Sequence, residues 1–357
     1  MTNEQDLDRK EKAFSDNPVM MGYDNRIFER DLDLGFRFPE GKIITSNGFI
    51  LLDEAIKRIK ENTGYPVILN IGDSSTSGWD SNKVNENPNS PFFNYKTYSD
   101  LLREQLFANV INAGVPGYTS YQGRKYLEVL LKKIAEENVN TDYVTIYFGN
   151  NDCTYNQIED KVRLDHKKPS FGSLGERVTA EDCKENLRDM IETTLEYGAK
   201  PVLIAPVIRY DWEPGIRADQ HREESLEILK KLNGSQLAKE IEMARELYEQ
   251  GRYKQACEAD RILPRLKKDY REAILQTARE TKTDLIDVQK QIPVTNSSYF
   301  ADYCHPLEPV NQMIVDEFSK IRERDVFHKP FSEKVKNLFG KSKTKNIGAP
   351  PDIYTLY

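Results

Sequence analysis

Short apolar runs alternate with helical segments from residue 66 to residue 288, and this order limits the fold more than any other feature. The apolar runs cover residues 66–71, 110–112, 142–148, 201–206 and 283–288. Helical spacing of apolar residues covers 98–106, 120–137 and 179–196. Strands that alternate with helices pair in parallel through right-handed crossovers. Continuous apolar strands also require cover on both faces. The sequence therefore predicts an α/β fold with a five-stranded parallel sheet.

The segments outside this repeat predict a three-part organisation. Residues 1–65 are expected to form a charged arm, a hairpin turning near Asn47-Gly48, and a helix over 52–62. Residues 66–330 are expected to form the main domain. Residues 331–357 combine turn formers with little periodicity and are expected to form a C-terminal tail.

A long insertion separates the fourth and fifth predicted strands. Its part from about 222 to 282 has helical spacing, and ARELYEQGRYKQA resembles one tetratricopeptide helix-turn-helix with Gly251 at the turn. One such unit cannot build a solenoid. We expect a helical hairpin packed on the core, and it is a candidate contact surface for a protein partner.

Composition excludes several classes of protein. The net charge of −7 argues against a general nucleic-acid binder. None of the four cysteines forms a CxxC pair, so free thiols in a reducing compartment are expected. The polar N-terminus lacks a leader-like apolar segment, and no apolar run approaches the ~20 residues of a membrane span. These features predict a cytoplasmic protein without a membrane span.

Residues that could take part in catalysis follow four of the predicted strands. They are Gly72-Asp73-Ser74, residues 112–117, Gly149-Asn150-Asn151-Asp152 and Asp302-Tyr303-Cys304-His305. Because the carboxyl ends of parallel strands share one sheet edge, all four sets are expected to converge there.

Ser74 has two readings, as a helix N-cap or as a nucleophile. A nucleophilic serine needs a base, and of the four histidines only His305 lies in an aromatic loop after a strand. Asp302, three residues earlier, is spaced to hold the imidazole Nδ1–H and leave Nε2 for the serine proton. The alternative is that Asp302 caps the next helix.

Acyl transfer builds negative charge on the former carbonyl oxygen, which needs donors already in place. The candidates are the backbone N–H groups of Ser74 and Gly117 and the side-chain amide of Asn151. Gly114 is a rival for the role of Gly117. Turn formation is the alternative reading of Gly117 and Asn151.

These four blocks, in this order, resemble those of the SGNH (GDSL-type) hydrolases, over residues 67 to about 322. The resemblance implies a flavodoxin-like three-layer α/β/α sandwich. It also implies Ser74 as nucleophile, His305 as base and Asp302 as its partner, with Ser74, Gly117 and Asn151 as the oxyanion hole. Asp73 and Asp152 would brace the loops. The resemblance implies no metal or other cofactor.

The function expected from this resemblance is hydrolysis of a small-molecule carboxylic ester through an acyl-enzyme. The polar loop after Ser74 favours a short acyl group, such as acetyl, on a polar or sugar-like carrier. Trp79 and Arg209 are candidate substrate contacts. The same residues would also serve an acyltransferase, in which an alcohol replaces water. A non-catalytic binding protein is a third reading, although Ser74, Asp302 and His305 are all present.

Overall fold

The computed structural model describes residues 28–31, 34–38, 41–45, 48–79, 95–154, 175–216, 222–231, 235–295 and 297–328. The chain divides into two compact units, Met1–Phe318 and Ser319–Tyr357. The N-terminal arm, most of the loop after Ser74 and the C-terminal tail lie outside the described residues.

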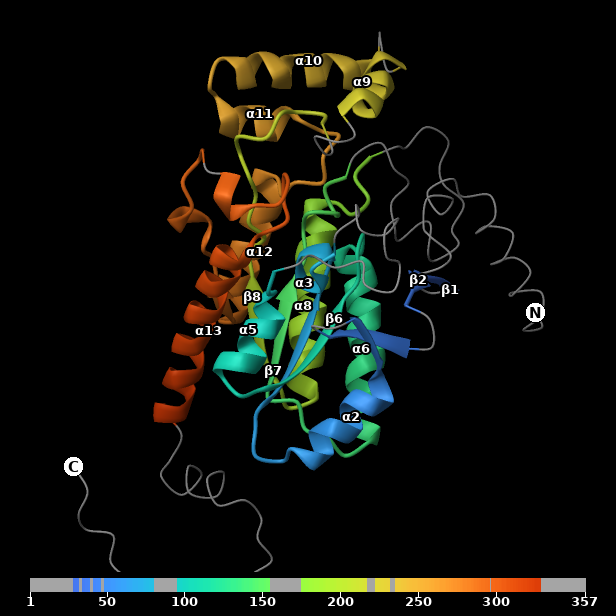
Figure 1. The fold of residues 1–357 in the computed structure, drawn as a ribbon, viewed down its shortest axis with the longest axis vertical. Helices are drawn as coiled ribbons and strands as arrows, with labels where there is room; N and C mark the ends of the chain where they lie inside the picture. Colours follow the sequence, from blue (N-terminus) through green and yellow to red (C-terminus); the bar gives the residue numbers. More distant parts are fainter. Residues whose placement is uncertain are drawn as a thin grey trace, which may run out of the picture. The chain divides into compact units, whose positions relative to one another are not determined.

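A seven-stranded sheet runs through the first unit in the order β4-β3-β6-β5-β7-β8-β9 (Figure 1). Its parallel strands are β5 (Val67–Gly72), β6 (Asn109–Gly114), β7 (Tyr143–Tyr147), β8 (Lys200–Ile204) and β9 (Asp284–Ile286). They are the five strands that the sequence predicts. The order reverses beside β5, which pairs with both β6 and β7, so the end of β5 lies where α/β sheets bind their ligands.

The prediction of a sheet with only five strands is wrong, because the N-terminal hairpin joins it. Strands β3 (Lys42–Thr45) and β4 (Gly48–Leu51) pair antiparallel, as the predicted hairpin requires, while Asn47 of its turn lies outside the described residues. Ile44 of β3 then pairs antiparallel with Asn112 of β6. A separate two-stranded sheet contains β1 (Glu29–Asp31) and β2 (Gly35–Arg37). Helix α2 (Leu52–Glu61) follows the hairpin as predicted.

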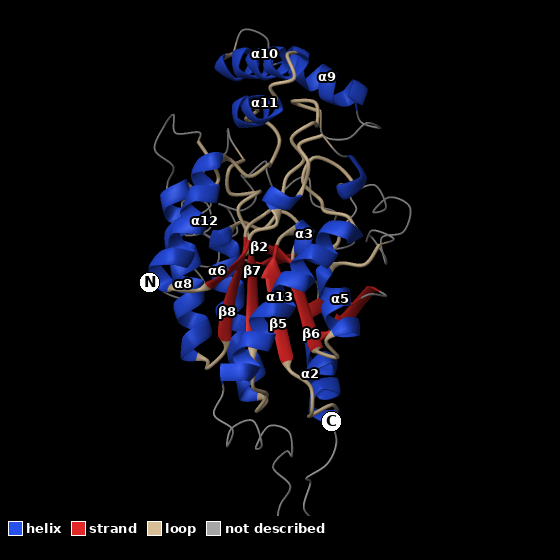
Figure 2. Cartoon of the chain, turned by 90° about the vertical axis from the view of Figure 1, so that its left-hand side faces the viewer, coloured by secondary structure: helices blue, strands red, loops and turns tan. Residues whose placement is uncertain are grey.

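Helices cover both faces of the sheet, as expected for a three-layer sandwich (Figure 2). One layer contains α6 (Ser120–Glu136), α8 (Ala180–Glu196) and α12 (Lys268–Thr281), in which α8 packs against both of the others. The opposite layer contains α5 (Tyr98–Gln105) and the start of α13 (Glu308–His328).

Successive side chains of β7 point alternately toward the two helical layers. Val144 and Ile146 lie in the same apolar core as the buried residues of α6 and α8. On the other face, the Tyr143 ring lies 5.2 Å from the ring of Phe318, and Thr145 Oγ1 lies 3.2 Å from the hydroxyl of Tyr98. Because successive strand residues point to opposite faces, β7 is covered on both sides.

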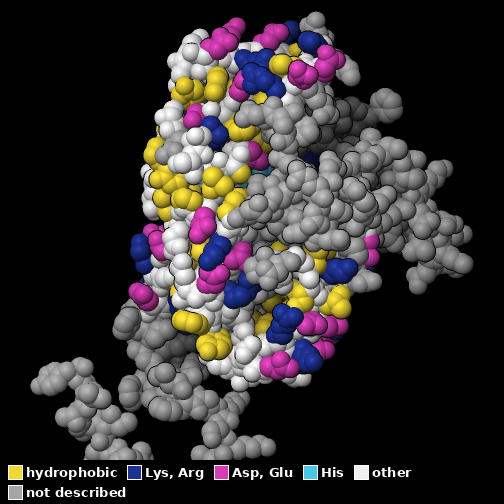
Figure 3. Space-filling model, viewed as in Figure 1, with side chains coloured by type: hydrophobic (Ala, Val, Ile, Leu, Met, Phe, Trp, Pro, Cys, Tyr) yellow, Lys and Arg dark blue, Asp and Glu magenta, His cyan; other side chains and the backbone are white. Residues whose placement is uncertain are grey.

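The insertion between β8 and β9 is helical. It contains α9 (Arg222–Lys231), α10 (Gln236–Glu249) and α11 (Tyr253–Ala259), and it leads into α12. Helices α10 and α11 form a hairpin, with Gly251 between them at φ +73°, a conformation that favours glycine. On the face shown in Figure 3, basic and acidic side chains are mixed where α9 and α10 lie.

Candidate active site

Ser74 begins the short helix α3 (Ser74–Ser77) directly after β5. Asp73 Oδ1 caps this helix by accepting the Ser75 N–H at 2.9 Å. A Cβ at Gly72 would lie 2.0 Å from Thr76 Oγ1, so only glycine lets α3 pack this closely on the end of the strand. The Asn112 side chain of β6 donates to Thr76 O at 2.9 Å. These contacts fix Ser74 at the carboxyl edge of the sheet, half-buried.

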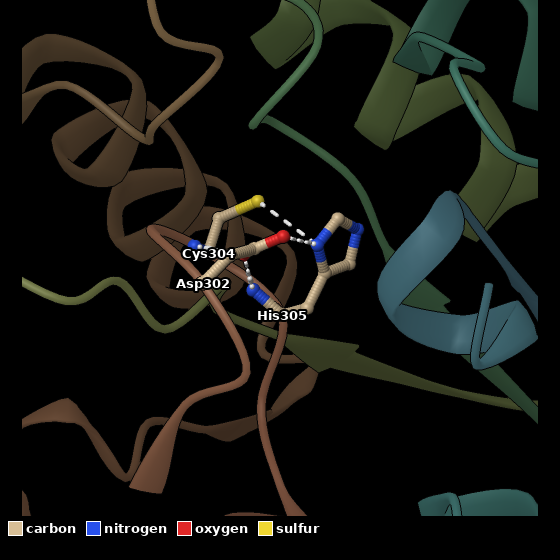
Figure 4. Close-up of side chains that lie close together, drawn as sticks. All are labelled: Asp302, Cys304 and His305. Atoms are coloured by element: carbon tan, nitrogen blue, oxygen red, sulfur yellow. Dashed lines mark hydrogen bonds and ion pairs between the residues drawn. The ribbon is translucent and has the colours of Figure 1, made fainter. Parts of the chain in front are cut away.

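His305 and Asp302 meet Ser74 from the loop that precedes α13. His305 Nε2 lies 2.7 Å from Ser74 Oγ, and His305 Nδ1 lies 2.6 Å from Asp302 Oδ2. Figure 4 shows the imidazole held against Asp302, with Cys304 beside both. The structure therefore brings Ser74, His305 and Asp302 into one chain of hydrogen bonds.

Asp302 also organises its own loop. Its Oδ1 accepts the backbone N–H groups of Cys304 and His305, both at 2.9 Å. The Ala301 N–H donates to His305 O at 2.9 Å and closes the turn. Asp302 therefore does cap backbone N–H groups, but within its own turn, since α13 begins later at Glu308. One oxygen shapes the loop and the other faces the imidazole.

The pKa values of His305 and Asp302 are shifted in opposite directions. Burial by itself disfavours the charged forms of both. For His305 burial is the largest single effect, but the charge of Asp302, the electrostatic contribution of Cys304 and the hydrogen bonds to both side chains together outweigh it and raise the pKa of His305 well above its ordinary value. The charge of His305 and the hydrogen bonds to Asp302 likewise hold the pKa of that carboxyl below its ordinary value. The pair therefore favours a carboxylate beside an imidazole that takes up a proton readily.

Cys304 is the one further group with metal-binding potential in this loop. Its Sγ lies 3.9 Å from His305 Nδ1, and the ligand atoms of Asp302, Cys304 and His305 lie within 4.8 Å of one another. Burial raises the pKa of the Cys304 thiol to about 11, so a thiolate is disfavoured at neutral pH. A metal at Nδ1 would also have to replace the hydrogen bond to Asp302. The geometry thus favours proton transfer over metal binding.

Gly117 and Asn151 lie in the loops after β6 and β7. Gly117 has φ +77°, and its carbonyl accepts a hydrogen bond from Arg177 Nη1 at 2.8 Å. Asn151 Nδ2 donates to Tyr118 O at 3.0 Å, and it lies 3.4 Å from Asp73 Oδ2. Asn151 is therefore bonded both to the loop of Gly117 and to the residue before Ser74. The contact with Asp73 is long for a hydrogen bond, which leaves that amide hydrogen weakly held.

Two buried aspartates brace these loops. Asp73 is 1% exposed, and burial raises its pKa to about 6. Asp152 accepts the Ser120 N–H at 3.1 Å and also bonds the Ser120 hydroxyl, at the start of α6. The cap that Asp73 forms on α3 and the bonds from Asp152 to Ser120 agree with the bracing roles that the resemblance implies.

The model of the GDSL-like lipase/acylhydrolase family matches residues 71–312, which is more than half of the chain. The chain belongs to the GDSL-like lipase/acylhydrolase family. No curated protein matches the sequence.

This acylhydrolase also resembles solved structures at low identity. A putative GDSL-like lipase from Parabacteroides merdae is 17% identical, with a TM-score of 0.40, over 71% of this chain and 94% of that one. A GDSL-like lipase from Bacteroides thetaiotaomicron is 15% identical, with a TM-score of 0.41, over 76% and 98%. An acetylxylan esterase from Geobacillus stearothermophilus is 16% identical, with a TM-score of 0.38, over 71% and 93%.

The two predicted substrate contacts of the acylhydrolase occupy different surroundings. Trp79 is 8% exposed, and its ring lies 5.4 Å from that of Phe28 within the core. Arg209 lies beside the His305 loop, because its backbone N–H donates to Tyr303 O at 3.0 Å. The Arg209 guanidinium pairs with Asp211 at 2.8 Å and stacks over Trp212 at 5.0 Å.

Two arginines that position these loops were not foreseen from the sequence. Arg265, 0% exposed, pairs with buried Asp260 at 2.8 Å and donates to the carbonyls of Arg209 and Trp212. Arg177 holds the carbonyl of Gly117. Arg265 stands in the run LPRLKK, where a basic residue is typical of a solvated face, so no local signal distinguishes it.

In the described part of the acylhydrolase, no helix has the length and apolar character needed to cross a membrane.

Proposed function

We propose that the protein is a serine esterase that acts through an acyl-enzyme on Ser74. Ser74 Oγ attacks the acyl carbonyl and gives its proton to His305 Nε2, which returns it to the leaving alcohol. Water, deprotonated by His305, then releases the acid. Asp302 holds the imidazole in the required tautomer and stabilises its charged form.

The observation that carries the proposal is the unbroken hydrogen-bond chain from Ser74 Oγ through His305 to Asp302, with distances of 2.7 and 2.6 Å. A nucleophile must lie within about 2.6–3.2 Å of its base. A packing role for Ser74 would not require its hydroxyl to face an imidazole that is itself oriented by a carboxylate. The family match supports the same reaction class.

Ser74, Gly117 and Asn151 are the proposed donors to the oxyanion. Arg177 holds the Gly117 carbonyl, and the positive φ of Gly117 sets the direction of its N–H relative to that carbonyl. The hydrogen bond from Asn151 to Tyr118 O ties the amide to the same loop. Donors held in this way need no reorganisation when charge develops, which is the main source of their effect.

We further propose a short acyl group, such as acetyl, on a polar or sugar-like alcohol. The Ser74 hydroxyl contacts His305, and the preceding residue, Asp73, lies within 3.4 Å of Asn151. These side chains are all polar. An alkyl chain is stabilised mainly by burial against apolar surface, which such side chains do not supply.

Arg209 is the proposed polar contact to the carrier, so Arg209→Ala should raise KM for the true substrate and leave KM for p-nitrophenyl acetate unchanged.

Hydrolysis of p-nitrophenyl acetate by Ser74→Ala and Ser75→Ala tests the proposal. Ser75 is a matched control, because it is the next residue and its hydroxyl has no hydrogen-bond partner among the described residues. We expect Ser74→Ala to abolish turnover and Ser75→Ala to retain it. Full turnover by Ser74→Ala would refute the assignment. Added alcohols that divert the acyl group from water would instead identify a transferase with the same nucleophile.

A further inference from the structure

A cleft lies between the helical insertion and α12. Its volume is about 610 Å³, and none of the residues that line it belongs to the Ser74–His305–Asp302 chain. Small-molecule sites commonly occupy about 300–1,000 Å³ and combine apolar walls with a few polar groups. This cleft has both the size and the mixed lining of such a site.

The walls of the cleft are largely apolar. They include Ile208 and Tyr210 after β8, Met243 and Leu247 of α10, and Leu266 before α12. Met243 is 49% exposed, which is high for a large apolar side chain in a helix that packs on its neighbour. Methionine adapts its shape to apolar ligands. These side chains suit an alkyl chain.

The charges that line the cleft are of both signs. Five basic and two acidic side chains line it, although the whole chain carries a net charge of −7. Both acids accept hydrogen bonds from neutral donors, which hold them in place and leave their charge: Glu258 accepts the Lys268 N–H at 3.0 Å, and Glu240 accepts from Gln236 at 3.2 Å. An anion would therefore depend on one particular basic side chain.

One lysine stands out among the five basic side chains. Arg261, Arg271 and Lys268 are paired with acids, and Lys267 Nζ donates to Cys257 O at 2.6 Å. Lys254 Nζ instead lies over the Tyr210 ring, 5.5 Å from its centre. Within the described part of the chain, no carboxylate forms an ion pair with Lys254. Lys267 also lacks a carboxylate partner among the described residues, but its Nζ is held by the Cys257 carbonyl, whereas Lys254 is exposed at the apolar wall. An exposed cation in that position suits a monoanion with an apolar tail.

We propose that this cleft binds an amphiphilic carboxylate, with the alkyl chain against Met243, Leu247 and Leu266 and the carboxylate at Lys254. The proposal does not depend on esterase chemistry. It does bear on the candidate active site, because the Leu266 N–H donates to Asn150 Oδ1 at 3.0 Å. A ligand in the cleft would therefore touch the residue that holds the loop carrying Asn151.

Calorimetric titration of the Ser74→Ala protein with decanoate, below its micelle concentration, tests the proposal. Removing Ser74 keeps this test separate from that of the esterase. Met243→Glu and Lys254→Glu are the cleft variants. Val129→Glu and Lys132→Glu are matched controls, because Val129 and Lys132 are exposed on α6, outside the cleft.

We expect saturable binding of decanoate that is about tenfold weaker or more in both cleft variants and unchanged in both controls. Decanol, which lacks the charge, should bind more weakly than decanoate, and acetate, which lacks the chain, should not bind. Absence of saturable binding, or equal binding by the cleft variants and the parent, would overturn the proposal. Equal affinity for decanol would overturn the assignment of Lys254 as the carboxylate contact.

Discussion

Replacing Asp302 with asparagine separates the two roles of its carboxylate, which are to hold its own loop and to orient His305. Oδ1 accepts two backbone N–H groups, and Oδ2 faces His305 Nδ1 at 2.6 Å. The asparagine oxygen must stay with the two N–H donors, so its NH₂ group faces Nδ1. Because Nδ1 must then accept a hydrogen bond, the ring proton moves to Nε2, which faces Ser74 Oγ at 2.7 Å. The loop is preserved, but the imidazole no longer accepts the serine proton.

Asp302→Asn is therefore expected to lower the catalytic rate and to leave the fold intact. Forcing the wrong tautomer on such a histidine lowers kcat by about 10⁴. The pH dependence should change as well. The charge of Asp302 raises the pKa of His305, and a protonated imidazole is not a base, so wild-type activity falls as pH drops through that raised value. Without the negative charge, residual activity should persist to lower pH.

Steady-state hydrolysis of p-nitrophenyl acetate across pH measures both effects. Asp269→Asn, which alters an exposed carboxylate in the first turn of α12, is a control for loss of charge. The melting temperature of Asp302→Asn should stay close to that of the parent, because the loop hydrogen bonds remain. A kcat within tenfold of the parent, or an unchanged pH midpoint, would refute the account of Asp302.

Two further predictions concern the loops around Ser74. Asn151→Ala should lower kcat by about 10²–10³ with little change in KM for p-nitrophenyl acetate; a fall in protein stability without a fall in kcat would contradict the oxyanion role. Arg265→Met leaves Asp260 buried without its partner and should destabilise the protein by about 3–5 kcal/mol in urea denaturation. Pairing Arg265→Met with Asp260→Asn should recover part of that loss, and no recovery would show that the ion pair is not the cause.

The sequence predicts the parallel part of the fold because its signals are local. Each of the five strands is a short, mostly apolar run, and each is followed by glycine, polar residues or a turn. Once the strands are parallel, the four blocks must share an edge, so the proximity of Ser74 and His305 could be expected across 231 positions of sequence.

Non-local contacts explain what the sequence missed. Strand β3 meets the sheet through one pairing, between Ile44 and Asn112, which no periodicity reveals. Trp79 follows the nucleophile block, yet it packs on Phe28 from the N-terminal region. Arg265 is buried where Asp260 and two distant carbonyls accept hydrogen bonds from its two terminal nitrogens. In each case the deciding partner lies far along the chain or in a segment without a distinctive pattern.

The most direct test of the central claim is to treat the protein with a fluorophosphonate and locate the adduct by mass spectrometry. Attack by an activated serine predicts one adduct, on Ser74, that is lost in Ser74→Ala and retained in Ser75→Ala. An adduct confined to another residue, or none under conditions that label a known serine hydrolase, would contradict the proposal that Ser74 is the nucleophile.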